Sequence, residues 1–190
     1  MHNDAVDLVI QRVAEHHRAC PEAVEWASKL PSFELMWERC TRPAWILGLF
    51  DEIDYHDEGR LRLFAASCAQ RNCDRVSDFD GDRFLAVARQ TASGDLAVDV
   101  LTNEAKVCRR LADEALSKHW TTVRAAVIDS VCDTLRLSPL AAAMNASQNG
   151  QKASLCIVKE EEWQAGELRK LFGYDLSHII KLGIRRVGRW

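Results

Sequence analysis

The sequence lacks the short motifs that mark the common classes of enzyme. Zinc-protease (HExxH), hydrolase (GxSxG), P-loop (GxxxxGK) and dinucleotide-binding (GxGxxG) signatures do not occur anywhere in its 190 residues. Its seven cysteines form no CxxC pair, and no histidine follows them at the spacing of a zinc site. We therefore predict no catalytic residue, no metal and no cofactor, and an enzyme is the least favoured class of function.

Long apolar runs and a strong net charge are also missing. No stretch approaches the roughly 20 apolar residues of a membrane span, and the N-terminal Met1-His2-Asn3-Asp4 lacks the basic region of a signal peptide. The formal net charge of −3 gives no reason to expect a polyanionic partner for the whole molecule. These absences predict a cytoplasmic protein.

The cysteines are odd in number and scattered, and most stand among alanine and valine. They are Cys20, Cys40, Cys68, Cys73, Cys108, Cys132 and Cys156. Such surroundings predict small, buried, apolar side chains in a reducing compartment. We expect all seven to be reduced and most of them to be buried.

Apolar residues recur with the period of an α-helix along most of the chain, beginning with Val6, Val9 and Ile10. Helix starts are marked by Pro21, by Ser32 and by Pro43. Strands that alternate with helices, as a parallel sheet requires, are not seen. The fold class predicted is all-α, an irregular bundle of about nine to eleven helices. The main expected helices span 22–29, 33–40, 43–50, 60–76, 84–93, 98–116, 119–137, 160–172 and 176–187.

A change in composition suggests where the domains divide. We expect a helical core domain over residues 1–145, with short Trp-rich helices in 1–50 and longer Ala-rich helices in 60–145. Asparagine, serine, glutamine and glycine gather from Asn145 to Ser154, which is typical of a flexible linker, and residues 146–157 are predicted as one. A C-terminal helical pair, 158–190, is expected to pack on the core. Only 155–158 has the composition of a strand, and it is short enough for helix or loop.

Asp78, Asp80 and Asp82 have the spacing that begins a calcium-binding loop. Such a loop then requires glycine at its sixth position and an acid at its twelfth, where this chain has Arg83 and Arg89. We therefore interpret the segment as a turn that caps the following helix.

Charge is unevenly distributed along the chain. The first 60 residues contain twelve acids and six bases, and one short segment concentrates acids around a tyrosine, a residue type enriched at interfaces. A basic protein partner is hypothesised to contact Asp51, Glu52, Asp54, Tyr55, Asp57 and Glu58. A solvated connector is the alternative interpretation of this segment.

The C-terminal end is basic and amphipathic, with six bases and two acids in residues 163–190. It could contact RNA, DNA or an anionic membrane surface. The candidate residues for an anionic partner are Lys181, Arg185, Arg186 and Arg189. The alternative is a last helix that docks its apolar face on the core and leaves the arginines in water.

Three tryptophans lie within twenty residues, at Trp26, Trp37 and Trp45, and Arg42 stands between the last two. We expect the three rings to be largely buried in a small helical subdomain. Arg42 is expected to stack on a ring or to pair with a carboxylate.

Around these residues the chain resembles the Imm-five-like bacterial immunity proteins and related helical proteins of planctomycetes. The shared patterns are A-C-x-x-A-x-x-W at 19–26, W-x-x-C-x-R-x-x-W-x-L at 37–47 and R-L-R-L-F-A-x-x-C-x-x-R at 60–71. Residues 84–96 and the segment E-L-R-K-L-F-G at 167–173 are similar as well. The resemblance is best over 19–97. It implies an all-α module that neutralises a toxin, and it brings no catalytic residues with it.

Two classes of function follow. The first is a non-enzymatic helical protein-binding module of the immunity or antitoxin type, which neutralises a partner toxin. The alternative is a regulatory or nucleic-acid-associated helical module of a bacterial defence or signalling system, which uses the basic C-terminal helix. The protein encoded by the adjacent gene is the first candidate partner. The sequence does not indicate an oligomeric state.

Overall fold

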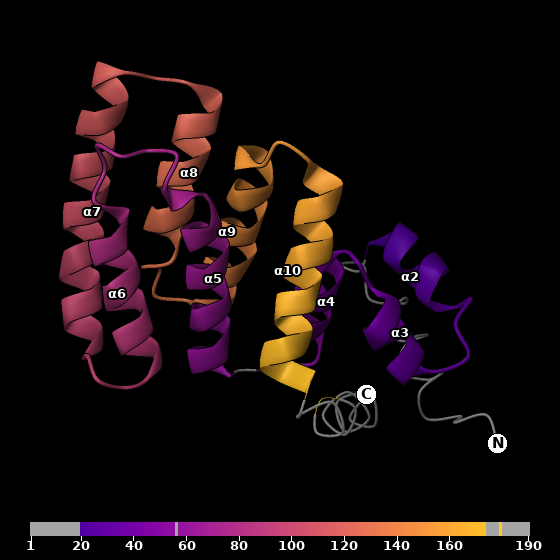
Figure 1. Cartoon of the computed structure of the whole chain (residues 1–190). Helices are drawn as coiled ribbons and strands as arrows, with labels where there is room; N and C mark the ends of the chain where they lie inside the picture. Colours follow the sequence, from indigo (N-terminus) through magenta and orange to yellow (C-terminus); the bar gives the residue numbers. More distant parts are fainter. Residues whose placement is uncertain (1–19, 56, 174–178, 180–190) are drawn as a thin grey trace. The chain divides into compact units, whose positions relative to one another are not determined.

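The computed structural model describes residues 20–55, 57–173 and 179, and this part of the chain contains nine α-helices and no strand (Figure 1). The helices are α2 (Pro21–Ala27), α3 (Phe33–Arg39), α4 (Pro43–Glu52), α5 (Glu58–Cys73), α6 (Gly81–Ala92), α7 (Val98–Lys118), α8 (Thr122–Asp133), α9 (Pro139–Ala153) and α10 (Ile157–Phe172). The predicted all-α bundle of about nine to eleven helices is confirmed. None of the described helices combines the length and the hydropathy that crossing a membrane requires.

The chain divides into two compact units. Unit 1 comprises Met1–His56 and Ala165–Trp190, and unit 2 comprises Asp57–Gln164. Helix α10 contributes its first half to unit 2 and its second half to unit 1. These two units do not coincide with the predicted core domain, 1–145, and C-terminal helical pair, 158–190.

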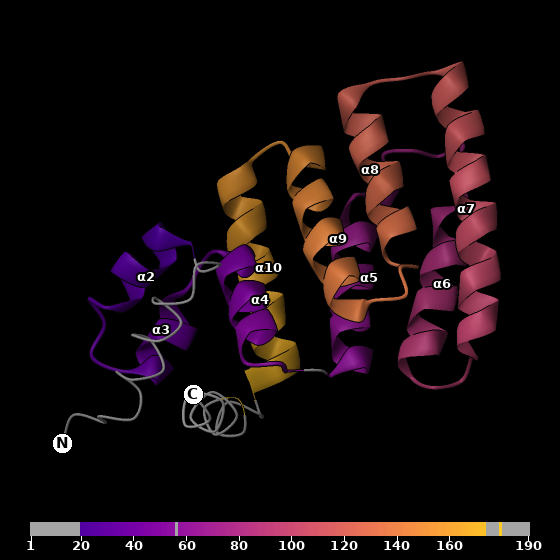
Figure 2. The same cartoon turned by 180° about the vertical axis from the view of Figure 1, so that it is seen from behind.

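Unit 2 is built from antiparallel neighbours. Figures 1 and 2 show that successive helices from α5 to α10 run in opposite directions. The α5–α6, α7–α8 and α9–α10 connections therefore lie at one end of the unit, and the α6–α7 and α8–α9 connections lie at the other. Helix α5 packs against α6, α8 and α9. Its apolar face contacts a core whose largest fully buried side chains include Phe84, Leu85, Leu101, Ile128 and Leu135.

Small residues fill the contact between α5 and α9. Both helices contribute fully buried alanines, which are Ala65, Ala66, Ala69, Ala142, Ala143 and Ala146. Small side chains allow two helix backbones to approach closely. Gly150 of α9 marks the tightest point, because a Cβ there would lie 3.5 Å from the carbonyl oxygen of Cys68 and 3.1 Å from Nε2 of Gln164.

The predicted linker at 146–157 is wrong. Helix α9 continues to Ala153, and only residues 154–156 separate it from α10, which begins at Ile157. The polar residues that suggested a linker include Ser147, which joins α9 to α10 by hydrogen bonds. The hydroxyl of Ser147 donates to Gln164 Oε1 at 2.7 Å, and the side-chain amide of Gln164 donates back to the Ser147 carbonyl at 3.2 Å. The 155–158 segment contains no strand, since α10 already includes its second half.

Short polar residues begin several helices. The side chains of Ser32, Asp57, Asp80, Thr121 and Ser138 each accept a hydrogen bond from the backbone N–H three residues later. This satisfies one of the N–H groups that a helix start leaves without a partner. Gly94, at φ +82°, follows the end of α6, where the left-handed conformation favours glycine.

Arginine side chains donate hydrogen bonds to backbone carbonyls at the C-terminal ends of some helices. We call these the arginine-capped ends. Arg62 of α5 is buried and donates from Nη1 to the carbonyls of Thr134 at 2.9 Å and Arg136 at 2.8 Å, just beyond α8. Arg75 donates to the carbonyl of Ala153, the last residue of α9. In unit 1, Nη1 of Arg169 donates to the carbonyl of Cys40 at 2.6 Å, after α3. Burial lowers the pKa of Arg62.

Unit 1 has an aromatic core. The ring of Phe50 lies 5.0 Å from that of Tyr55, 5.0 Å from that of Phe172 and 6.0 Å from that of Trp37, centroid to centroid. These distances are those of favourable aromatic pairs. Trp37 is 4% exposed, so the prediction of burial is confirmed for this ring.

Trp26 and Trp45 are mostly covered as well, although less completely than Trp37. They pack on each other with their ring centroids 5.5 Å apart. Arg42 lies over Trp45, at 4.7 Å from the ring centroid, and forms a 3.1 Å ion pair with Glu22. Both contacts proposed for Arg42 are therefore present.

Candidate functional site

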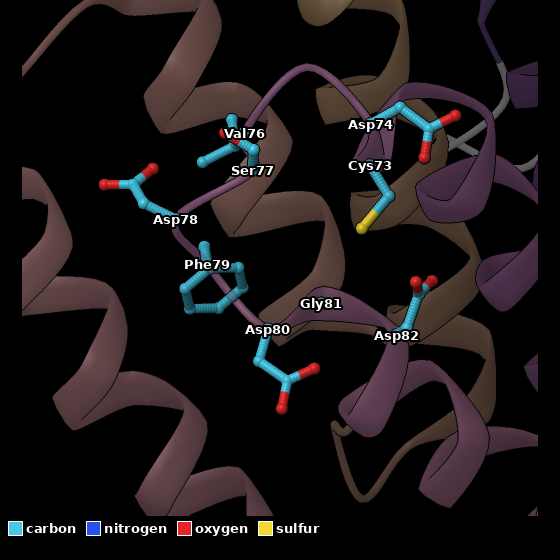
Figure 3. Close-up of a pocket in the computed structure, with 9 residues that line it drawn as sticks. All are labelled: Cys73, Asp74, Val76, Ser77, Asp78, Phe79, Asp80, Gly81 and Asp82. Atoms are coloured by element: carbon cyan, nitrogen blue, oxygen red, sulfur yellow. The ribbon is translucent and has the colours of Figure 1, made fainter.

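A cavity of about 530 Å³ lies at the end of unit 2 that carries the α5–α6, α7–α8 and α9–α10 connections, which we call the loop end. Its lining comes from one segment, residues 73–82, here called the acidic loop (Figure 3). The loop contributes the acids Asp74, Asp78, Asp80 and Asp82, all exposed, together with the buried Cys73.

The carboxylates of the acidic loop do not converge. Figure 3 shows Asp74 and Asp78 on opposite sides of the loop, pointing away from each other. Asp78 binds Nη1 and Nη2 of Arg124 at 2.6 and 2.8 Å, and this hydrogen bonding holds the pKa of Asp78 below its ordinary value. Asp80 caps α6, which confirms the predicted capped turn. No group of three or more metal-ligating side chains occurs in the part of the chain that the structure describes.

Cys73 is not poised as a nucleophile. Burial is the main cause that raises its pKa to about 11, and the nearby carboxylate of Asp82 adds to the shift. A thiol with this pKa keeps its proton at neutral pH, whereas the thiolate is the reactive form. The sulfur also packs against the backbone of Gly81, leaving no room for a Cβ at that position. The cavity therefore offers a negatively charged surface and no activated group.

Large apolar side chains are exposed at the other two connections of the loop end. Trp120 in the α7–α8 connection is 66% exposed, and Leu155 in the α9–α10 connection is 91% exposed. Val123, Ile157 and Val158 at the adjoining helix starts are exposed as well. The opposite end of the unit has fewer such residues, at Val98, Val100 and Leu137.

Two arginines hold the acidic loop. Arg124, near the start of α8, is buried and holds Asp78, and it also donates to the carbonyl of Ala115 in α7 at 3.3 Å. Arg75 of the loop itself bonds the last residue of α9, Ala153. These contacts tie the acidic loop to α8 through Arg124 and to the last residue of α9 through Arg75.

A second group of buried polar residues joins α5, α9 and α10 within unit 2. Glu160, 3% exposed, forms a 2.8 Å ion pair with Arg71, whose guanidinium also lies 4.4 Å from the ring centroid of Trp163. Gln164 donates to the second oxygen of Glu160 at 3.1 Å. Glu160 and Gln164 thus have hydrogen-bond partners within the unit, so the network contributes to the packing of α10 on α5 and α9.

The acidic segment proposed from the sequence has a different structure from the one expected. Asp51 and Glu52 end α4, and Asp57 caps α5 while pairing with Arg60 at 3.3 Å. Tyr55 is 4% exposed within the aromatic core, so its proposed role as a contact residue is wrong. The segment also crosses from unit 1 to unit 2 at residue 57. A binding role for its acids, which are Asp51, Glu52, Asp54, Asp57 and Glu58, stays a prediction.

The basic candidates Lys181, Arg185, Arg186 and Arg189 lie outside the described residues. Their proposed contacts with an anionic partner also stay a prediction.

Sequence reasoning did not single out the loop end. Trp120 follows Lys118-His119 and precedes two threonines, and a tryptophan placed in a polar connection, away from any apolar helix face, was the available signal. Leu155, Ile157 and Val158 were noticed only as a strand-like run. They are exposed because they follow α9 in a short connection and at the start of α10. The composition of residues 145–154 predicted a linker in place of α9, so this position was not expected.

Comparisons of this chain with protein-family models, with curated proteins and with solved structures found no match, so the resemblance to the immunity proteins stays a prediction.

Proposed function

We propose that this chain is a non-enzymatic helical protein-binding module of the immunity type, which neutralises a partner protein by stoichiometric binding. The observation that supports this proposal is the loop end of unit 2. There, the α7–α8 and α9–α10 connections carry solvent-exposed apolar side chains, and the α5–α6 connection is the acidic loop that Arg75 and Arg124 tie to α9 and α8.

The physical character of this surface favours a protein partner. Exposed apolar residues that gather at one place mark interaction sites more often than scattered ones do, and tryptophan is the residue type most enriched among binding hot spots. The acids of the loop add charge that would attract lysine and arginine and would discourage other acidic surfaces. The partner that fits is therefore a protein with a basic rim around an apolar patch.

Binding of a partner would require little rearrangement of the acidic loop. The acidic loop is tied to α8 and α9, so a partner would not have to order it, and ordering costs subtract directly from affinity. The absence of an activated nucleophile or of converging carboxylates at the acidic loop agrees with binding as the purpose of this surface.

The experiment uses the full chain and the protein encoded by the adjacent gene, with affinity measured by calorimetry. Trp120→Ala should weaken binding roughly 30-fold or more, the effect of losing a hot spot worth about 2 kcal/mol. Leu137→Ala is the matched control, because Leu137 is 63% exposed but lies at the opposite end of unit 2. Equal affinity of both variants and the parent would remove the loop end from the proposal.

The acids of the 51–58 segment provide the competing surface. Replacing Asp51, Glu52, Asp54, Asp57 and Glu58 with amides should leave the affinity almost unchanged if the loop end binds the partner. Slower association with a flatter salt dependence would assign the interface to that segment instead. Salt-sensitive retention of RNA or DNA that is lost on deleting residues 179–190 would favour the nucleic-acid alternative.

A further inference from the structure

Cys108 and Cys132 face each other across two antiparallel helices of unit 2. Cys108 lies in α7 and Cys132 in α8, and their sulfur atoms are 3.0 Å apart. Both side chains are buried, at 0% and 7% exposure.

The surrounding contacts keep the two sulfurs together. Arg109, the residue after Cys108, forms a 3.0 Å ion pair with Asp129, which lies one helical turn before Cys132. Helices α7 and α8 are also joined by a connection of only three residues, 119–121. These contacts hold α7 and α8 together at the two sulfurs, within a core that includes Leu101, Ala112 and Ile128.

We infer that Cys108 and Cys132 form an oxidisable dithiol site that a peroxide converts into an intrachain disulfide. A disulfide has a sulfur–sulfur distance of about 2.05 Å, so the sulfurs must approach by about 1 Å. This inference does not depend on the proposed binding function.

The two sulfurs have different roles in the reaction. The hydrogen bond with Cys132 and, after it, burial raise the pKa of Cys108, which therefore keeps its proton. Cys132, the less buried of the two, is the sulfur that meets the oxidant. As it loses its proton, the sulfur of Cys132 attacks one oxygen of hydrogen peroxide, the O–O bond breaks, and the released hydroxide takes up that proton, giving water and a sulfenic acid.

Cys108 then resolves the sulfenic acid. Its sulfur attacks the sulfur of Cys132, the S–O bond breaks, and hydroxide leaves with the proton of Cys108 as a second water. In sum, two thiols are oxidised to one disulfide and one peroxide is reduced to two waters. A thiol reductant reverses the change.

The test uses the full chain with Cys20→Ser and Cys156→Ser, because these two cysteines are exposed and would consume oxidant. After treatment with hydrogen peroxide the protein is denatured, labelled with N-ethylmaleimide and weighed. We expect three maleimide adducts in place of the five given by the untreated protein, which retains five cysteines. Peptide mapping should identify the crosslink as Cys108 to Cys132, and dithiothreitol should restore all five adducts.

Two further variants make the test specific. Cys108→Ala should give no crosslinked peptide and should leave a sulfenic acid at Cys132 that dimedone traps. Cys68→Ala, which removes a cysteine of equal burial, should still give the crosslink. Five adducts after peroxide treatment, a crosslink between other cysteines, or a sulfinic acid at Cys132 in the parent would each overturn the inference, and none of these readouts requires a partner.

Discussion

Replacing Arg62 with methionine tests whether the arginine-capped ends stabilise this fold. Methionine keeps an unbranched stem as far as the position of Nε, so the packing of the stem changes little while the guanidinium is lost. Arg62 donates at 2.9 and 2.8 Å to the carbonyls of Thr134 and Arg136, and a weaker contact reaches Leu137 at 3.4 Å. Because Thr134 is fully buried, water cannot replace the lost donor there.

The magnitude follows from two opposing effects. Each hydrogen bond from a charged donor contributes about 1.5–3 kcal/mol, and two good ones are lost. Methionine also removes the cost of burying a charge, which is several kcal/mol before compensation. We expect a net loss of about 2–4 kcal/mol in the free energy of unfolding, or roughly 5–15 °C in melting temperature for a chain of this size.

Urea denaturation followed by far-UV circular dichroism measures this loss, and the midpoint should fall with little change in slope. Arg60→Met is the matched control on the same helix. Arg60 pairs with Asp57 near the surface, at 35% side-chain exposure, and such a pair contributes about 1 kcal/mol or less. If Arg62→Met proved as stable as Arg60→Met, the carbonyls after α8 would not need the guanidinium, and the reasoning would be wrong.

Two other predictions concern single side chains. Trp37→Ala should lower the free energy of unfolding by about 3–5 kcal/mol because the ring is buried. Trp45→Ala should lower it by roughly 1–2 kcal/mol because that ring is half-buried. Equal losses of the two variants in urea denaturation would contradict this difference. Arg124 lowers the folded-state pKa of Asp78, so the stability that this pair contributes should be present above the unfolded pKa of about 3.9 and lost as pH falls through the folded pKa. The difference in melting temperature between the parent and Asp78→Asn should accordingly stay constant from about pH 5 to 8 and shrink in acid, and a difference that grows in acid would refute the assignment.

The fold class was predictable because helical periodicity is a local property of the sequence. Prolines and short polar caps gave several helix starts to within a few residues, as at Pro21, Ser32 and Pro43. Helix ends were predicted less well. The expected helix 119–137 is α8, which stops at Asp133, because Arg62 binds the carbonyls beyond it. That partner lies 72 residues away in the sequence, and no local pattern contains it.

The failed linker prediction has a similar cause. Small and polar residues such as Ser147 and Gly150 suit a flexible segment, and they equally suit a helix face that is packed closely and hydrogen-bonded. The choice between the two depends on Gln164, which comes later in the chain and fills the space beside Gly150. The loop end was missed for the same reason, since the three connections that form it meet only in the folded protein.

The arginine-capped ends make helix termination in this chain a tertiary property. A helix that ends at glycine can end in an isolated fragment, whereas the turns after α3, α8 and α9 rely on Arg169, Arg62 and Arg75 from other segments. Local and global order are thereby coupled, and the last turns of these helices form only when the segment that carries the donor arginine is already in place. A fragment limited to residues 122–153 would consequently fray at both of its C-terminal turns, and the intact chain should show correspondingly few partly folded states.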